Sequence, residues 1–303
     1  MEQSKLQTMA VTAARGRLLA MDMVHAAASG HIGGSLSSMD IITTLYFHVM
    51  RVNPANPQDP DRDRFVLSKG HCTPALYPML ALRGFFPVSD LSMFRRIDGE
   101  MSGHAEMRHV KGVDMSTGSL GQGISAAVGM ALAGKADRKD YRVYTLLGDG
   151  EIEEGQVWEA AMAAAKYHLD NLCAIVDVNG LQIDGPTAEV MPSEPLDKKF
   201  EAFNWNVIHV DGHDFEALDQ AFQAAAACKG KPTVLLAKTI KGKGVSFMEN
   251  QFGWHGKAPN DEQYAQAHGE LLQGLMDRMK QAGLPVSEQT ATTYGVLSDK
   301  EGV

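Results

Sequence analysis

The chain has 303 residues, which is enough to bury a large core as one α/β unit or two small domains. Hydrophobic residues make up 44% and charged residues 21%, as in ordinary soluble globular proteins, and no 18-residue apolar run or apolar signal segment suggests a membrane protein. The formal net charge of −9 and the isoelectric point near 5.6 argue against nucleic acid or an anionic membrane as a partner.

The net charge and the cysteines also limit which ligand and which cellular compartment we expect. A phosphate-bearing ligand would have to be held by local dipoles and a metal ion, because the chain has no broad basic field. Cys72, Cys173 and Cys228 are widely spaced and form no CxxC motif. They predict no disulfide framework, and a reducing cytoplasm is the expected compartment.

The first predicted element is a helix over residues 3–28, where apolar side chains recur at steps of three and four before the stop signal Ser29-Gly30. His31 follows in a glycine-rich loop that leads to a second helix. A histidine beside glycines is often only an exposed loop residue. Its position alone therefore leaves the role of His31 open.

A short strand over residues 64–67 runs into Ser68-Lys69-Gly70-His71, with a helix over residues 74–82 behind it. This order places His71 at the carboxyl edge of a strand, where α/β sheets bind ligands, although a histidine that caps its own helix fits equally well. Residues 84–116 look irregular, with a short helix over residues 90–96 and with His104 in a loop. Zinc is a common partner of histidines, but these three belong to no HxxxH or HExxH motif that would support it.

The glycine-rich segment over residues 117–123 opens a helix predicted for residues 120–135, which is rich in small residues. Each glycine costs a helix about 1 kcal/mol relative to alanine, so we expect close packing in the core or at a subunit interface. Two nucleotide-binding patterns fail here. The glycines of residues 118–123 have the wrong order for a dinucleotide fingerprint, and the GxxxxGK match over residues 129–135 lacks the next Ser or Thr of a P-loop.

A strand–helix–strand unit occupies the middle of the chain. A buried strand over residues 141–147 ends at Gly148-Asp149-Gly150, and a helix leads to a second strand over residues 172–176, just before Asp177 and Asn179. Such a unit builds parallel sheet, so Asp149 and Asn179 should meet at the carboxyl edge although they are 30 positions apart. With the carbonyl of Leu181, they offer the hard oxygen ligands that Mg²⁺ prefers beside phosphate.

The residues around Asp149 also suit a bound anion. Gly148 and Gly150 let the backbone approach a ligand, and a helix opening after Gly150 would aim free N–H groups at it. Glu151 and Glu153 would repel a phosphate, so they are expected to point outward.

Two further strands are predicted over residues 205–210 and 233–237, with a helix capped by Asp214 between them. His213 is interpreted as a turn residue. A basic loop follows the second strand, and its lysines are interpreted as solvated rather than as a phosphate loop: Lys238, Lys241 and Lys243. A polar helix over residues 260–282 and a loose tail over residues 284–303 complete the chain.

The segment GDGEIEEG, followed after about 30 residues by DVNGLQIDG, resembles the thiamine diphosphate motif in the form that transketolases use. The resemblance extends from Ser29 to about Asn260 and includes further motifs in the same order: SGHIGG from residue 29, LSKGH from 67, SGH from 102, TGSLGQG from 117 and WHG from 254. It implies an α/β thiamine diphosphate-binding fold, a mostly parallel sheet with helices on both faces. Residues 1–283 would form the diphosphate-binding domain and residues 284–303 a C-terminal tail.

The resemblance assigns roles to individual residues. Four histidines would act in catalysis: His31 in proton transfer, His71 at the diphosphate, His104 at the hydroxyls of the donor sugar, and His255 near both. The implied cofactor contacts are His71, Gly118, Leu120, Gly148, Asp149, Gly150, Asn179, Ile183 (against the thiazolium ring) and His255. The implied ligands of Mg²⁺, with Ca²⁺ or Mn²⁺ as substitutes, are Asp149, Asn179 and Leu181. Glu154 and Glu159 match acids of a subunit interface that links paired active sites.

By the same resemblance, the chain would be the N-terminal subunit of a two-chain transketolase that moves a two-carbon ketol unit from a ketose phosphate to an aldose phosphate. The pyrimidine-binding domain would come from a second, C-terminal subunit, in a heterotetramer with two copies of each chain. Donor and acceptor stay open, with pentose phosphates and branched or sulfonated sugars as candidates. Two alternatives remain: another two-chain thiamine diphosphate enzyme, such as an α-keto-acid dehydrogenase component or a deoxyxylulose-phosphate synthase relative, and a non-catalytic regulatory copy. The histidine set favours transketolase, and the intact Asp149 and Asn179 speak against a dead copy.

Overall fold

The structure, a computed structural model, describes residues 1–286 of the chain. Its centre is a sheet of five strands, all parallel, with the spatial order β1-β2-β3-β5-β4. The predicted parallel sheet is therefore confirmed. In chain order the strands are β1 (Arg64–Leu67), β2 (Val143–Gly148), β3 (Leu172–Val178), β4 (Asn206–Asp211) and β5 (Thr233–Lys238).

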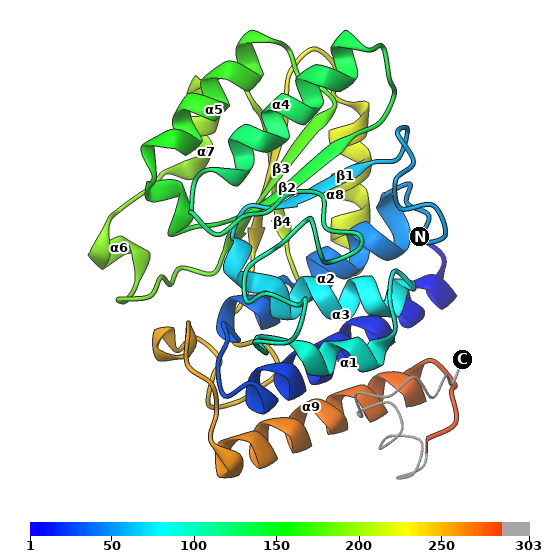
Figure 1. Cartoon of the computed structure of the whole chain (residues 1–303). Coiled ribbons are helices and arrows are strands. Elements are labelled where there is room, and N and C mark those ends of the chain that lie inside the picture. Colours follow the sequence, from blue (N-terminus) through cyan, green and yellow to red (C-terminus); the bar gives the residue numbers. More distant parts are fainter. Residues whose placement is uncertain (287–303) are drawn as a thin grey trace.

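Helices cover both faces of the sheet, as predicted (Figure 1). One face packs against α1 (Gln3–Ala26), α2 (Gly33–Thr44), α3 (Thr73–Arg83) and α8 (Phe215–Ala227), and α9 (Asp261–Gln281) lies outside them along α1. The other face packs against α4 (Gly123–Ala136), α5 (Gly155–Lys166) and α7 (Leu196–Ala202). The short α6 (Thr187–Val190) projects from the side of the sheet and buries none of its residues (Figure 1).

The apolar run that ends at Asp149 belongs to a strand that is buried on both faces. Because successive side chains of a strand point to opposite faces, Tyr144 and Leu146 join the cluster under α1, α2 and α3. Val143 and Leu147 join the separate cluster under α4 and α5. Full burial of a leucine contributes about 2 kcal/mol to stability. The packing on both faces therefore fixes the position in the sheet at which β2 ends.

Several element boundaries differ from the prediction. The glycine-rich segment after residue 117 forms a turn over residues 119–122, and α4 begins only at Gly123. After Gly150 the chain makes a single 3₁₀ turn over Glu151–Glu153, and α5 begins at Gly155. The short helix expected over residues 90–96 is a 3₁₀ turn over Val88–Met93. These ends are set by tertiary hydrogen bonds, which periodicity does not report.

The end of the described chain packs on the first layer. Asn260 caps α9 through a reciprocal pair of bonds with Gln263. Leu284 and Val286 pack against the cluster under α1. Residues 287–303 of the predicted tail lie outside the described part, and the domain boundary at residue 283 stays a prediction. No helix within residues 1–286 has the length and apolar character needed to cross a bilayer.

Candidate active site

The candidate site lies at the carboxyl edge of the sheet, where four strands end in polar segments. Ser68 to His71 follow β1, Asp149 follows β2, Asn179 follows β3, and Lys241 lies just beyond β5. The register sets the ends of β2 and β3 level, since Gly148 pairs with Asp177. Polar groups from distant parts of the chain therefore converge, as the strand–helix–strand unit predicts.

The structure brings the three predicted metal ligands together. The carboxylate of Asp149 accepts N–H bonds from Gly150 and from Gly180, the neighbour of Asn179. The side-chain oxygen of Asn179 accepts from the N–H of Leu181 at 3.1 Å. Asp149 is only 4% exposed, and burial followed by the negative charge of Asp177 raises its pKa to about 6.

Asp177 orients Asn179 from inside the protein. Its Oδ2 accepts from the amide nitrogen of Asn179 at 3.1 Å and also from the ammonium of Lys69. Holding the amide nitrogen on the inner side turns the amide oxygen the other way, toward the loop of Leu181. Ser37 donates to the same Oδ2 and Thr239 donates to Oδ1, so both oxygens of this fully buried acid have hydrogen-bond donors.

Glu151 points inward, so the expected outward orientation is wrong for it. It is 2% exposed, and its carboxylate accepts from the hydroxyl of Ser68 at 2.5 Å and from the N–H groups of Gly121 and Gly148 at 3.0 Å each. The carboxylate thus provides acceptors for two backbone N–H groups, of which that of Gly121 is buried, and this gives the inward acid a structural role. The predicted helix N-terminus directly after Gly150 is also wrong, because Glu151 and its 3₁₀ turn occupy that position.

Glu153 is half-buried and accepts from the side-chain amide of Gln182 at 2.9 Å. Gly150 is required by this packing, because a Cβ at its position would lie 2.8 Å from the Cβ of Gln182. At Gly148 a Cβ would meet the side chains of Glu151 and Lys69 at 3.9 Å, an ordinary van der Waals contact, so the local packing does not require glycine there as it does at Gly150.

The four predicted histidines form one cluster beside the candidate metal ligands. The ring of His31 lies 5.0 Å from that of His71, 5.8 Å from that of His104 and 5.5 Å from that of His255. The rings of His71 and His255 are 5.0 Å apart. Residues separated by up to 224 positions in the sequence thus share one small surface.

Local hydrogen bonds hold the cluster in shape. The hydroxyl of Tyr77 donates to the carbonyl of His104 at 3.1 Å, and the N–H of Ala105 donates to the carbonyl of Gly70 at 3.2 Å. On the opposite side the loop of His255 packs on the start of α2. Gly33 is needed there, because a Cβ on it would lie 2.8 Å from the carbonyl of Trp254.

All four histidines are held in the neutral form near pH 7. Burial and the nearby Arg95 lower the pKa of His31 to about 4, and burial and Lys241 lower the pKa of His255 to about 3. Burial followed by the charge of Lys69 holds the pKa of His71 well below its usual range, and burial with Arg95 lowers the pKa of His104. A neutral imidazole carries one donor and one acceptor, which is what binding of a sugar hydroxyl requires.

Lys241 is buried rather than solvated, so the interpretation of its loop as fully solvated is wrong at this residue. Its side chain is 3% exposed, and its ammonium lies 3.3 Å from the carbonyl of Leu181 and 3.2 Å from Nδ1 of His255. Burial and the positive charge of Lys69 lower the pKa of Lys241. Lys238 is exposed and Lys243 is half-buried beside Glu249.

The remaining predicted residues lie at the rim of the site. Gly118 faces the cluster, since a Cβ on it would lie 3.2 Å from the ring of His104, and Leu120, two residues further along the chain, is half-buried. Ile183 is 58% exposed in the loop after Leu181. Glu154 and Glu159 are exposed at the start of α5, so the structure does not bring them into the histidine cluster.

The residues of this edge fit a hard divalent cation bound to a diphosphate. Asp149, Asn179 and the carbonyl of Leu181 are oxygen donors of the kind that Mg²⁺ takes. The buried ammonium of Lys241 beside the Leu181 carbonyl supplies positive charge for an anionic tail. The roles of the individual residues stay predictions.

Sequence reasoning missed three residues that shape the site: Lys69, Glu151 and Asp177. A signal exists for two of them. Asp177 interrupts an apolar strand two residues before Asn179, hence on the same side of the chain, and Lys69 follows a strand directly where the chain enters the sheet edge. When an acid and a base are both buried at the ends of neighbouring elements, they are expected to form an ion pair.

Comparison with known proteins assigns the fold and the site to a class. Residues 8–278 match the family described as "Transketolase, thiamine diphosphate binding domain". The chain therefore carries a thiamine diphosphate-binding α/β domain. It belongs to the transketolase family, which confirms the resemblance noted in its motifs.

Three similar proteins illustrate the match. The chain is 47% identical over 255 residues to the 6-deoxy-6-sulfo-D-fructose transketolase subunit SqwG of Clostridium sp., covering 84% of this chain and 93% of that protein. It is 43% identical over 271 residues to an apulose-4-phosphate transketolase subunit of Phocaeicola vulgatus, covering 89% of this chain and 96% of that protein. The crystal structure of transketolase from Campylobacter jejuni aligns with a TM-score of 0.80 and 33% identity, covering 97% of this chain and 46% of that one.

The two kinds of relative differ in length. This chain spans about half of the Campylobacter jejuni transketolase chain but nearly all of the two subunits. The same fold therefore occurs both as half of a longer transketolase chain and as a separate subunit.

Proposed function

We propose that this protein is the diphosphate-binding, N-terminal subunit of a two-chain transketolase. It would transfer a two-carbon ketol unit from a ketose to an aldose, with sugar phosphates or a related anionic sugar as substrates. The observation that carries this proposal is the cluster of four neutral histidines, which Lys241 links to the loop of Asn179 and Leu181 by contacting both His255 and the carbonyl of Leu181. Chemistry on a polyhydroxylated substrate needs several donors and acceptors at a cofactor, and this edge provides them.

The cofactor of the proposed reaction is thiamine diphosphate with Mg²⁺. When bound, thiamine diphosphate would supply the carbanion-stabilising chemistry that the ketol transfer needs. Asp149, Asn179 and Leu181 would hold the metal, and His71 and Lys241 would face the diphosphate. Ca²⁺ or Mn²⁺ could take the place of Mg²⁺ because the ligands are all oxygen atoms.

The histidines of this chain would bind and orient the sugar. His104 is exposed on the open side of the cluster, and His31 lies between it and His255. As neutral groups they exchange hydroxyl protons by donating from one ring nitrogen while accepting at the other. His31, held at 3.4 Å by the guanidinium of Arg95, is the candidate for moving a proton to or from the reacting hydroxyl.

A second chain would complete the active site with a pyrimidine-binding domain. The two relatives that this chain covers almost completely are both named as transketolase subunits, which supports a separate partner. We propose a heterotetramer with two copies of each chain, in which Glu154 and Glu159, both exposed, lie between the paired sites. The free thiols of Cys72 and Cys173 and the substrate class favour the cytoplasm, where pentose phosphates are metabolised.

The proposal is tested by mixing the full chain with a candidate partner chain, thiamine diphosphate and Mg²⁺. Ketol transfer from ketose donors, phosphorylated, branched and sulfonated, is followed by chromatography of the product sugars. We expect turnover with at least one donor and only in the presence of both chains. Turnover with a 2-keto acid and with no ketose would identify a different thiamine diphosphate enzyme instead.

Asp149→Asn serves as the matched variant, because it keeps the shape of the side chain and removes the ligand charge. It should weaken Mg²⁺-dependent binding of thiamine diphosphate by about 100-fold or more, since even supporting residues of metal sites contribute roughly 10–100-fold. Isothermal titration calorimetry on the assembled protein gives this affinity without an activity assay. Equal affinities of wild type and variant would exclude Asp149 as a metal ligand.

A further inference from the structure

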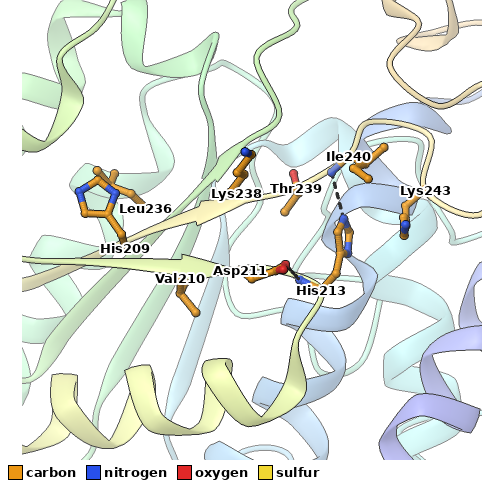
Figure 2. A pocket seen from close by; sticks show the side chains of 9 residues that line it. All are labelled: His209, Val210, Asp211, His213, Leu236, Lys238, Thr239, Ile240 and Lys243. Atoms are coloured by element: carbon orange, nitrogen blue, oxygen red, sulfur yellow. Dashed lines mark hydrogen bonds between the residues drawn. The ribbon is translucent and has the colours of Figure 1, made fainter.

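His213 lies outside the histidine cluster, yet it bonds to the loop that carries two residues of the site. It follows β4, and its Nδ1 lies 2.7 Å from Oδ2 of Asp40. Its Nε2 accepts the backbone N–H of Ile240 at 2.9 Å (Figure 2). The ring thus connects a carboxylate on α2 to the first residues after β5.

The hydrogen-bond partners fix the tautomer of His213. Arg17 on α1 donates to both oxygens of Asp40, at 2.9 and 2.6 Å. Burial alone would raise the pKa of Asp40, but Arg17 and His213 hold it well below its usual range, so the carboxylate is ionised. It accepts the proton on Nδ1, which leaves the lone pair of Nε2 for the N–H of Ile240.

The loop after Ile240 depends on this bond for its position. Lys241 is the next residue, and its carbonyl accepts from Asn250 at 2.9 Å. The N–H of Gly242 donates to the carbonyl of Gly33 at 2.9 Å, close to the start of α2. The ammonium of Lys241 then reaches His255 at the far end of the same loop.

We infer that His213 is a positioning residue, which holds the loop of residues 239–256 so that Lys241 and His255 face the diphosphate and the sugar. The inference rests on the proposed function, because these two residues matter only if a cofactor binds at this edge. The relay runs from Arg17 through Asp40 and His213 to the N–H of Ile240, and it touches neither substrate nor cofactor. Its effect is transmitted entirely by the loop backbone.

Water has access to this bond from an open cavity of about 560 Å³, whose lining includes His213, Ile240 and Lys243 (Figure 2). If the acceptor on His213 is lost, the N–H of Ile240 will therefore bond to water. The loop keeps its covalent path but loses a fixed point one residue away from Lys241.

Two variants distinguish the effect of the His213 hydrogen bonds from the effect of its side-chain volume. His213→Leu removes both bonds, whereas His213→Gln offers an amide with one donor for Asp40 and one acceptor for Ile240. His48→Leu is the matched control, because His48 also pairs with a buried carboxylate, Asp219 at 2.8 Å, but lies away from the loop. Each is prepared as the full chain together with its partner chain.

Two measurements are made on each protein: hydrogen–deuterium exchange over residues 239–256 without cofactor, and the affinity for thiamine diphosphate with Mg²⁺ by calorimetry. For His213→Leu we expect faster exchange in the loop and ~10-fold or greater loss of affinity, as for other residues that support a binding site. His213→Gln should restore both, and His48→Leu should change neither. If His213→Leu does not fold, the comparison of His213→Gln with a shorter amide, His213→Asn, gives the same contrast.

The inference is overturned if loop exchange and affinity in His213→Leu equal those of the wild type, or if His213→Gln behaves like His213→Leu. Failure of the proposed function gives a different pattern. The wild type itself would then bind no thiamine diphosphate, while exchange in the loop would still respond to His213.

Discussion

Lys69 and Asp177 meet at the carboxyl edge of the sheet with almost no contact to solvent. Burial alone would lower the pKa of Lys69, but the adjacent carboxylate of Asp177 raises it above its ordinary value; the same pairing lowers the pKa of Asp177. Both pKa shifts favour the ionised forms of Lys69 and Asp177. Such a pair adds little to the stability of the fold compared with apolar groups of the same volume. Removing one partner, however, leaves the other as a buried charge without a counter-ion.

We predict that Asp177→Asn lowers the free energy of unfolding by about 3 kcal/mol, because the ammonium of Lys69 is left without a countercharge. Lys69→Met in the same chain should recover at least about 1 kcal/mol of this loss. Urea denaturation of the two single variants and the double variant gives the coupling. Additive effects would show that the two side chains do not act as a pair.

At the scale of residues, the sequence predicted the position of a side chain correctly where that residue comes just after the end of a strand. Asp149 and Asn179 come after two apolar runs, and parallel pairing alone places them together. Glu151 and Lys241 could not be assigned in this way, because their burial depends on the backbone of other loops: Gly121 and Gly148 for the acid, and Leu181 for the lysine.

At the scale of elements, α1 and α9 pack along each other outside the sheet. Asp22 of α1 accepts from the hydroxyl of Tyr264 on α9 at 2.9 Å, and His268 of α9 lies 3.8 Å from the same carboxylate. His25 stacks on Tyr264 with ring centroids 3.9 Å apart. Burial raises the pKa of Asp22 to about 7, against the smaller opposing effect of the Tyr264 bond.

This contact predicts a pH-dependent stability. The folded pKa of Asp22 lies above its ordinary value of 3.8, so the folded state binds the proton more tightly than the unfolded state does. The stabilising contribution is therefore complete below about pH 4 and is lost as the pH rises to about 7. Asp22→Asn, which keeps an acceptor for Tyr264, should be more stable than wild type above pH 7 by at most about 4 kcal/mol.

Urea denaturation of Asp22→Asn and wild type between pH 4.5 and pH 8 measures this difference. It should grow with pH and level off above pH 7. A difference that stays constant over this range would mean that Asp22 ionises as freely in the folded protein as in the unfolded chain.

The elements themselves were largely predictable, and their ends were not. The steps of three and four in residues 3–28 correspond to α1, and the apolar runs correspond to β2 and β3. The start of α5 moved to Gly155 because Glu151 turns inward to bind two backbone N–H groups. Such a start is decided by long-range contacts, whereas a periodic pattern reports only which face is buried.

For the molecule as a whole, exposed apolar side chains gather in the segment that follows Leu181. Ile183 is 58% exposed, Met191 is 57% exposed, and Val190 of α6 is also exposed. All three follow closely after the candidate ligand Leu181. Exposed apolar side chains that lie close together often mark a surface that another chain covers.

We therefore predict that a pyrimidine-domain partner protects Met191 from hydroxyl-radical oxidation. Tyr167, 52% exposed at the end of α5, is the internal reference. Mass spectrometry of the free chain and of the complex should show several-fold slower oxidation of Met191 and little change at Tyr167. Unchanged oxidation of Met191 in the complex would place the partner elsewhere.

The low pKa values of the histidine cluster have a consequence for assembly. Uncharged imidazoles release their bound water at a far smaller energetic cost than imidazolium ions or carboxylates do. A second chain that covers His31, His104 and His255 can therefore displace water from these three side chains without burying imidazolium ions that lack a counter-ion. Because the pKa values of His31 and His255 are about 4 and about 3, these two imidazoles stay uncharged from about pH 5 to pH 8, and covering them buries no new charge over that range.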